Sequence, residues 1–284
     1  MDGEILNSIV QVSLLVFVVS SMLAMGLSLT VGQIIEPLRS VRLVVVALAA
    51  NFIAVPLIGW GLGKVLSLDD GLAIGLTIMA TAAGAPFLPK LAGAARGNMA
   101  FSVGLMVLLM VVTVGYMPLV LPLLIEGVDV DPAAIASSLV FLMLLPLAIG
   151  LLLRWRYESM AESLQPLMTQ TSTVAIAALL GAGVIVNFDD IVDLIGTGGF
   201  VAILLFLALS GAIGYAGGGS DPAARSVLGL GTAQRNLSAA LVVGGQNFSD
   251  TPGVITFIIV AGIVGLIVLL PAAGEIGRRA APAA

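Results

Sequence analysis

Two basic residues stand inside stretches that otherwise have the composition of membrane helices. Lys90 lies in "GAPFLPKLAGAARGN", residues 84–98, and Arg235 lies in "GLGTAQRNLS", residues 229–238. A charge at the bilayer centre costs about 2.5–3.5 kcal/mol on insertion scales, so such a side chain must face protein or water. Ammonium and guanidinium groups at that depth can donate hydrogen bonds to freed backbone carbonyls or attract an anion.

The composition of the whole chain indicates a membrane protein. Of its 284 residues, 60% are hydrophobic and 10% are charged. A helix needs about 20 apolar residues to cross the hydrocarbon core. Nine stretches meet this length: 6–29, 41–65, 71–93, 99–125, 133–153, 164–186, 194–216, 224–246 and 253–274. We therefore predict an all-α polytopic protein with nine transmembrane helices, forming a single membrane domain over residues 1–284.

Several functional classes are disfavoured by the residues that the chain lacks. It contains no cysteine and no histidine, so thiolate and imidazole metal ligands are absent. No acidic side chain is predicted at membrane depth, where an intramembrane enzyme would need catalytic groups. We expect no enzymatic activity, no cofactor, no bound metal and no nucleic-acid partner, whereas the lipid bilayer surrounds the protein.

Charged residues sort between the two sets of loops. Acidic residues gather in one set, namely Asp2, Glu4, Asp69, Asp70, Glu126, Asp129, Asp131, Asp189, Asp190, Asp193 and Asp250. Most basic residues fall in the other set, namely Arg39, Arg42, Arg96, Arg154, Arg156, Arg225, Arg278 and Arg279. Basic loops mark the cytoplasmic side. This predicts a multi-pass protein of the inner (plasma) membrane with its N-terminus outside and its C-terminus in the cytoplasm.

An internal repeat places the two unusual stretches in equivalent positions. "AMGLSLTVGQII", residues 24–35, resembles "GAGVIVNFDDIV", residues 181–192, so the first four predicted helices match the sixth to the ninth. The offset of five helices is odd, and the second copy is therefore inverted. Inverted repeats with interrupted helices are typical of secondary transporters.

Each of the two matching helices carries signals for a break. In 71–93 the signals are Gly84, Pro86 and Pro89, because proline removes an amide donor and disfavours helix before it. In 224–246 they are two glycines followed by polar side chains, namely Gly229, Gly231, Thr232, Gln234, Arg235 and Asn236. We predict that both helices are broken and cross near the membrane centre.

Four motifs resemble one known family, the bile acid:sodium symporters. They are "MGLSLT" at 25–30, "NFIAVP" at 51–56, "ARGN" at 95–98 and "QRNLSAAL" at 234–241. The resemblance implies two inverted repeats whose broken helices cross. It also implies a panel of helices 6–29, 133–153 and 164–186, a core over 41–125 and 194–274, and a substrate crevice between panel and core.

The chain departs from the family's sodium-coupled members at the positions that the resemblance assigns to sodium. Pro86 and Phe87 stand where those members carry a Ser-Asn pair. Gly231 stands in place of a glutamate, and Arg235 in place of a glutamine. Sodium prefers hard oxygen ligands, including carboxylates, and nearby fixed cations repel it. We hypothesise that Lys90 and Arg235 replace the two sodium ions in a divergent member that lacks the sodium ligands.

These observations define a candidate site and a function. The substrate or ion site is expected to comprise Lys90, Arg235, Asn236, Gln234, Asn51, Pro86, Phe87, Thr232 and Ser238. The polar run "TQTST" adds Thr169, Thr171 and Thr173 as possible cavity-lining residues. We predict a secondary transporter that moves a small organic anion by alternating access without sodium. Proton coupling through Lys90, retained sodium coupling and a channel remain the alternatives.

Overall fold

The computed structural model describes residues 2–35, 39–125, 131–186 and 188–280. Within these ranges the regular structure consists of helices, without strands. Their bounds are α1 Asp2–Ser28, α2 Val31–Ile35, α3 Val41–Ala49, α4 Val55–Val65, α5 Asp70–Thr81, α6 Leu88–Ala94, α7 Met99–Leu124, α8 Pro132–Leu139, α9 Leu145–Arg156, α10 Glu158–Val186, α11 Phe188–Gly196, α12 Gly199–Gly217, α13 Pro222–Ala233, α14 Leu237–Asn247 and α15 Val254–Arg279. Two π-helical turns, η2 Ala50–Ala54 and η3 Val140–Leu144, join α3 to α4 and α8 to α9.

Seven helical spans in the described ranges are long and apolar enough to cross a membrane. They cover 8–28, 41–65, 99–124, 132–156, 158–185, 199–217 and 254–279. Such helices satisfy every backbone polar group internally, which the hydrocarbon core requires. The two other predicted spans, 71–93 and 224–246, are each divided into two shorter helices, α5–α6 and α13–α14. Seven candidate spans are thus shown, and the count of nine stays a prediction.

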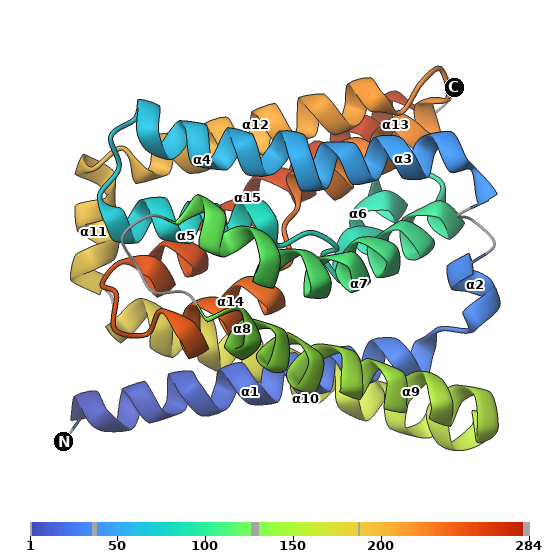
Figure 1. Ribbon diagram of the computed structural model, residues 1–284. Coiled ribbons are helices and arrows are strands. Elements are labelled where there is room, and N and C mark those ends of the chain that lie inside the picture. Colours follow the sequence, from blue (N-terminus) through green and yellow to red (C-terminus); the bar gives the residue numbers. More distant parts are fainter. Residues whose placement is uncertain (1, 36–38, 126–130, 187, 281–284) are drawn as a thin grey trace.

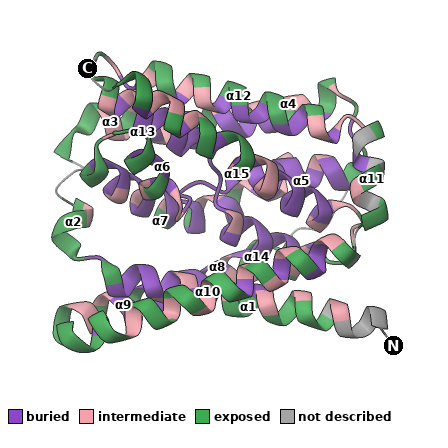
Figure 2. Cartoon of the chain, turned by 180° about the vertical axis from the view of Figure 1, so that it is seen from behind, coloured by how far each residue is buried: buried purple, intermediate pink, exposed green. Residues whose placement is uncertain are grey.

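The helices form three layers (Figure 1). α1, α9 and α10 pack against one another in one outer layer, and α3, α4 and α12 lie in the opposite one. The broken pairs, α7 and α15 lie between these layers. Buried residues concentrate in this middle layer, especially on α5, α13, α14 and α15 (Figure 2). The middle layer therefore holds the protein core and the backbone breaks.

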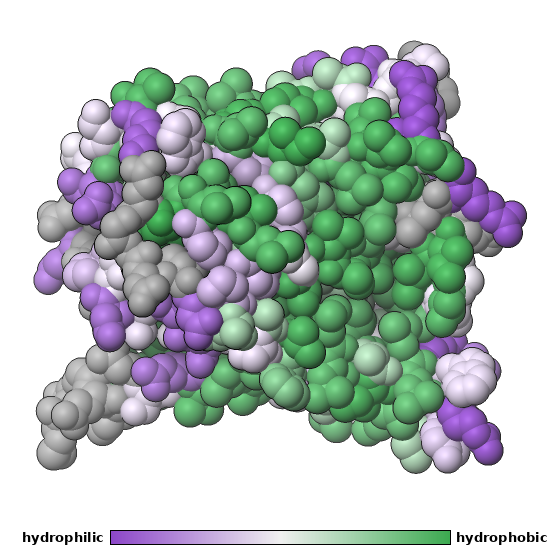
Figure 3. Space-filling model, in the orientation of Figure 1, coloured by the Kyte–Doolittle hydropathy of each residue, from purple (hydrophilic) through white to green (hydrophobic). Residues whose placement is uncertain are grey.

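The polar residues gather at the two ends of the helices, and hydrophobic residues cover the surface between them (Figure 3). At the basic end, Gly277 packs against Ala94, and Arg42 lies beside the Gly219 turn. At the opposite, acidic end, Gly71 packs against Pro252. The loop residues of like charge thus share an end, although Glu126 and Asp129 lie outside the described residues.

The first break is made by glycine and proline. α5 ends at Thr81 and α6 begins at Leu88. Gly84 has a φ of +80°, and a Cβ there would lie 2.6 Å from the Cα of Met110 on α7. Only glycine combines this left-handed backbone with such a close approach. Pro89 occupies the first turn of α6, where its missing amide is not needed.

The second break has a different origin. It covers residues 234–236, and the Asn236 side chain caps α14 by accepting a hydrogen bond from the amide of Ala239 at 3.1 Å. Gly229 and Gly231 lie within α13 and serve helix packing instead. A Cβ on Gly231 would lie 2.9 Å from the Cδ2 of Leu88 on α6. The sequence signals located this break, but the capping asparagine rather than the glycines forms it.

Candidate functional site

The two breaks meet through direct hydrogen bonds. The last carbonyls of a helix have no partner within it, and those after α5 are bound by the second break. The Asn236 amide donates to the carbonyl of Ala82 at 2.8 Å, and its Nδ2 donates to that of Gly84 at 3.0 Å. The residue that caps α14 therefore also fastens it to the end of α5.

The guanidinium of Arg235 lies at this crossing, inside a cage of four oxygen atoms. Its Nε donates to the carbonyl of Met79 at 3.0 Å, and its Nη2 donates to that of Ala80 at 2.7 Å. Its Nη1 donates to Asn51 Oδ1 at 2.7 Å and to the carbonyl of Thr232 at 3.2 Å. Arg235 is only 4% exposed. The carbonyl ends of α5 and α13 carry partial negative charge, which stabilises a cation here.

Asn51 links this cage to the outer layer of the protein. It lies in η2 and is fully buried, as is Thr232 on α13. Its Nδ2 donates to the Ala47 carbonyl at 3.0 Å and to Thr232 Oγ1 at 3.2 Å, so that its Oδ1 faces the guanidinium. The amide orientation is thus fixed by two donor bonds on one side and the cation on the other.

Two residues of α7 that were not expected at the site support the crossing. Thr113 Oγ1 accepts from the Ala83 amide at 3.0 Å and donates to the Ala83 carbonyl at 3.1 Å. Tyr116 donates to the carbonyl of Phe52 in η2 at 2.6 Å. A polar side chain in the otherwise apolar run 99–124 was the available signal. The carbonyls of the cage have no such signal, since every residue type carries one.

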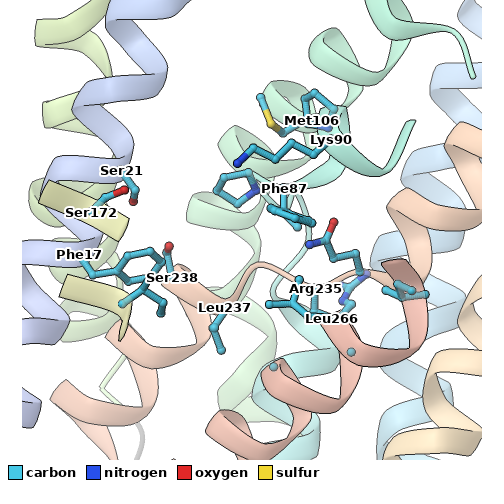
Figure 4. Close-up of a pocket in the computed structure, with 18 of the residues that line it drawn as sticks. Phe17, Ser21, Phe87, Lys90, Met106, Ser172, Arg235, Leu237, Ser238 and Leu266 are labelled. Atoms are coloured by element: carbon cyan, nitrogen blue, oxygen red, sulfur yellow. The ribbon is translucent and has the colours of Figure 1, made fainter. Parts of the chain in front are cut away.

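A cavity of about 580 Å³ adjoins the crossing. One wall comes from α1 and α10, and the other comes from α5, α6, α7, α12 and α15, with the start of α14 between them. Figure 4 shows Phe17, Ser21 and Ser172 across the open space from Phe87, Lys90 and Met106. Apolar side chains form most of this lining, including Phe206, Leu237, Phe257 and Leu266. The cavity thus offers an apolar volume with few polar groups.

Lys90 has a different environment from Arg235. It is exposed in the first turn of α6, and its side chain extends into the cavity (Figure 4). Its Nζ lies 5.2 Å from the centre of the Phe87 ring, a distance that allows a cation–π contact. In the described ranges no hydrogen bond from Nζ to a freed carbonyl is found. The structure therefore brings Arg235, but not Lys90, into the cage at the crossing.

The remaining predicted residues divide between the cage and the cavity. Asn51, Thr232 and Asn236 belong to the crossing. The predicted residues that line the cavity are Pro86, Phe87, Gln234, Ser238, Thr169 and Thr173, together with Lys90 and one edge of Arg235. Thr171 donates to the Leu167 carbonyl at 2.9 Å and is not part of the lining. Sequence reasoning missed the polar lining residues Ser21, Ser28, Gln165 and Ser172.

Gln234 is a polar group of the cavity wall that lacks a partner. The side chain is 9% exposed, and its Oε1 is buried without a hydrogen bond in the described part of the chain. A buried acceptor without a donor costs free energy. Several hydroxyl groups on the opposite wall use their protons internally; for example, Ser21 donates to the Val18 carbonyl at 2.9 Å. The cavity therefore presents one accessible cation and several unused acceptor sites.

Acidic groups are missing from this lining. None of the residues that surround the cavity is Asp or Glu. Over the described ranges, no group of three or more His, Cys, Asp and Glu side chains could hold a metal ion. The charge of the site thus comes from basic side chains and from helix ends.

Comparisons with known proteins agree with this architecture. The family model of the Sodium Bile acid symporter family matches residues 14–194. A "probable sodium/metabolite cotransporter BASS3, chloroplastic" of Arabidopsis thaliana is 26% identical over 195 residues, which cover 68% of this chain and 45% of that protein. An "uncharacterized sodium-dependent transporter YocS" of Bacillus subtilis is 25% identical over 177 residues, covering 61% and 54%.

Two features of these matches bear on the site. The chain spans about half the length of the curated relatives it matches. The family match includes the first break and ends before α12, so Arg235 lies beyond it. More than half of the chain is nevertheless covered by the family model. The chain therefore belongs to the sodium bile acid symporter family.

Proposed function

We propose that this protein is a secondary transporter that moves a small organic anion by alternating access, without sodium at the helix crossing. The observation that carries the proposal is the pairing of two cations with different surroundings. Arg235 is enclosed by four oxygens at the crossing, and Lys90 is exposed in the adjoining cavity. One cation has a structural environment, and the other is available to a substrate.

Arg235 takes the place of a bound cation. A cage of carbonyl and amide oxygens between two helix ends is the environment that a hard cation prefers. Here a guanidinium fills it, and guanidinium stays charged at accessible pH. Gly231, at the position of a family glutamate, faces Leu88 and Leu105. The site therefore has a permanent cation and no carboxylate, and both features disfavour Na⁺.

The names of the relatives favour sodium coupling as the second candidate. Both matched transporters are described as sodium-dependent or sodium cotransporters. Their sodium coupling would apply to this chain if the crossing bound Na⁺ beside Arg235. Proton coupling and channel activity rest on no contact in the cavity and are disfavoured.

Lys90 determines the substrate class. Because Arg235 uses its donors in the cage, Lys90 is the cation that the cavity offers to a ligand. The N-terminus of α14, where Leu237 and Ser238 line the cavity, adds positive potential. A volume of about 580 Å³ with mainly apolar walls suits a small amphipathic monoanion, such as a carboxylate or sulfonate.

The order of the helices supports the inverted repeat and the moving parts. In both halves a long helix is followed by a short one, a further long helix, a broken pair and a last long helix: α1 to α7 and α10 to α15. The first set begins toward the basic end and the second toward the acidic end. We propose nine spans, counting each broken pair once, with a panel of α1, α8–α9 and α10 that moves against the remaining core.

Substrate transport by the full-length protein in proteoliposomes tests the proposal. Small radiolabelled carboxylates and sulfonates would be screened by counterflow, with choline replacing Na⁺ at constant ionic strength. We expect one or more to accumulate in both media, and Lys90→Gln to raise the half-saturating concentration at least tenfold, since the charged partner is lost. Gln33→Ala, a change of a polar residue outside this cavity, serves as the control. Strict dependence on Na⁺, or unchanged affinity in Lys90→Gln, would overturn the proposal.

A further inference from the structure

Two arginines at the basic end converge on one glycine turn, away from the substrate cavity. The turn is Gly217–Gly219, where α12 ends. Arg42 lies in the first turn of α3, and a Cβ on Gly219 would be 3.6–3.8 Å from its guanidinium atoms. Arg225 lies in α13, and its main chain packs against Gly218. Because α12 contacts both α3 and α13, the two side chains share one surface at the helix ends.

These arginines differ from the other basic residues at this end in lacking a carboxylate. Arg154 lies 3.0 Å from Glu158, and Arg279 lies 2.7 Å from Glu275. In the part of the chain that the structure describes, neither Arg42 nor Arg225 has an acidic group within 4.0 Å. Asp221, the nearest acid along the chain to the turn, caps α13 by accepting from the Ala223 amide at 3.0 Å. The turn therefore carries two uncompensated positive charges.

Arg225 is also held in place with a donor unused. Its guanidinium carbon lies 4.1 Å from the centre of the Tyr215 ring, which fixes the side chain by a cation–π contact. Its Nε is buried and has no hydrogen-bond partner among the described residues. An unsatisfied donor on a positioned guanidinium favours an anionic acceptor. The arrangement is thus prepared for an anion rather than for water alone.

The position of the turn identifies the anion. α12 is a candidate membrane span of 19 residues, so its last residues lie at the level of the lipid headgroups. Tyr215 is 41% exposed, and interfacial tyrosines are typical of this depth. Val41 and Val45 on α3 are largely exposed beside Arg42, as expected of side chains that face acyl chains. Glycine leaves the backbone of the turn open to an approaching headgroup.

We propose that Arg42, Arg225 and the Gly217–Gly219 turn bind the phosphate of an anionic phospholipid. Two guanidinium groups match a phosphate through parallel N–H···O bonds. Basic pockets between transmembrane helices on the cytoplasmic side bind anionic headgroups in this manner. The bound lipid would link α3, α12 and α13 at the end of the core where helix contacts are fewest in carboxylate pairs.

Lipid-dependent stability of the purified full-length protein tests this site. The melting temperature would be measured in detergent with added dioleoyl phosphatidylglycerol or dioleoyl phosphatidylcholine. We expect phosphatidylglycerol, but not phosphatidylcholine, to raise it by several degrees. Arg42→Gln and Arg225→Gln should each remove at least half of this rise, and Arg279→Gln should keep it, because that residue lies at the same end but pairs with Glu275.

Three further outcomes decide the interpretation. An equal rise in all variants would overturn the site, since the effect would then be one of general membrane charge. A rise with inorganic phosphate at matched ionic strength would show a soluble anion site instead. Should Arg225→Gln fail to fold, the exposed Arg42→Gln still decides, with lipid retention measured by native mass spectrometry: retained phosphatidylglycerol at the wild-type level would contradict the proposal.

Discussion

At the residue scale, burial and hydrogen bonding assign different tasks to two cations that look alike in sequence. Lys90 and Arg235 both follow a break in an apolar stretch, and the sequence predicts that both bind freed carbonyls. The structure places Arg235 in the cage and leaves Lys90 in the cavity. The difference depends on reach: Lys90 lies in α6, which leads away from the crossing, whereas Arg235 lies within the break itself. Spacing along the chain cannot distinguish these two cases.

Replacement of Arg235 tests whether a cation is required at the crossing. We expect the melting temperature of the wild-type protein to be unchanged when Na⁺ replaces choline at constant ionic strength. Arg235→Gln should be much less stable, because each hydrogen bond to a charged group contributes about 1.5–3 kcal/mol. Na⁺ should restore part of this loss by binding the emptied oxygens, since a ligand of the folded state stabilises it by mass action. Arg235→Lys, which keeps the charge, is the matched control.

Two results would contradict this account of Arg235. A rise in the wild-type melting temperature at millimolar Na⁺ would mean that sodium binds despite the guanidinium. Wild-type stability of Arg235→Gln in choline would mean that the four oxygens do not need a cation.

At the element scale, the sequence predicts where helices are interrupted better than how. Both breaks fall inside the predicted stretches 71–93 and 224–246. Proline and glycine are local signals, and they explain the first break directly. The second depends on Asn236, whose cap and bonds to Ala82 and Gly84 join residues about 150 positions apart. The short helices α2 and α11 were also missed, because segments of this length give little periodic signal.

Gly84 makes the first break sensitive to a single methyl group. Gly84→Ala places a Cβ 2.6 Å from the Met110 Cα at a φ of +80°. The left-handed backbone costs about 1–2 kcal/mol in a non-glycine residue, and overpacking against main chain adds about 1–3 kcal/mol. We expect a large loss of stability in a thermal or SDS unfolding assay. Gly115→Ala on α7, where a Cβ would meet nothing within 4 Å, should be neutral, and equal stability of the two variants would refute the close approach.

At the scale of the whole molecule, the cavity and the contacts that close it occupy opposite halves. On α1 the cavity is lined by residues between Phe17 and Leu29, toward the basic end. A second pocket at that end shares Leu29 and Val103 with it. Toward the acidic end, Leu14 on α1 packs beside Gly245 on α14, and Ile259 on α15 packs beside Gly183 on α10. The molecule is therefore open toward the basic end and closed toward the acidic end.

This asymmetry predicts the side from which the cavity is reached. The chain contains no cysteine, so single-cysteine variants each carry one reactive thiol. Val103→Cys, in the shared part of the two pockets, should react with a membrane-impermeant maleimide in inside-out vesicles and little in right-side-out vesicles. Val65→Cys, 81% exposed at the acidic end, should show the reverse, and Ile259→Cys, fully buried in the closed contact, should react from neither side. Labelling of Val103→Cys from the outside alone would place the basic loops outside the cell, against the rule that assigns them to the cytoplasm. Rapid labelling of Ile259→Cys would instead show that the acidic half is open, and that the resting protein favours the other state of the transport cycle.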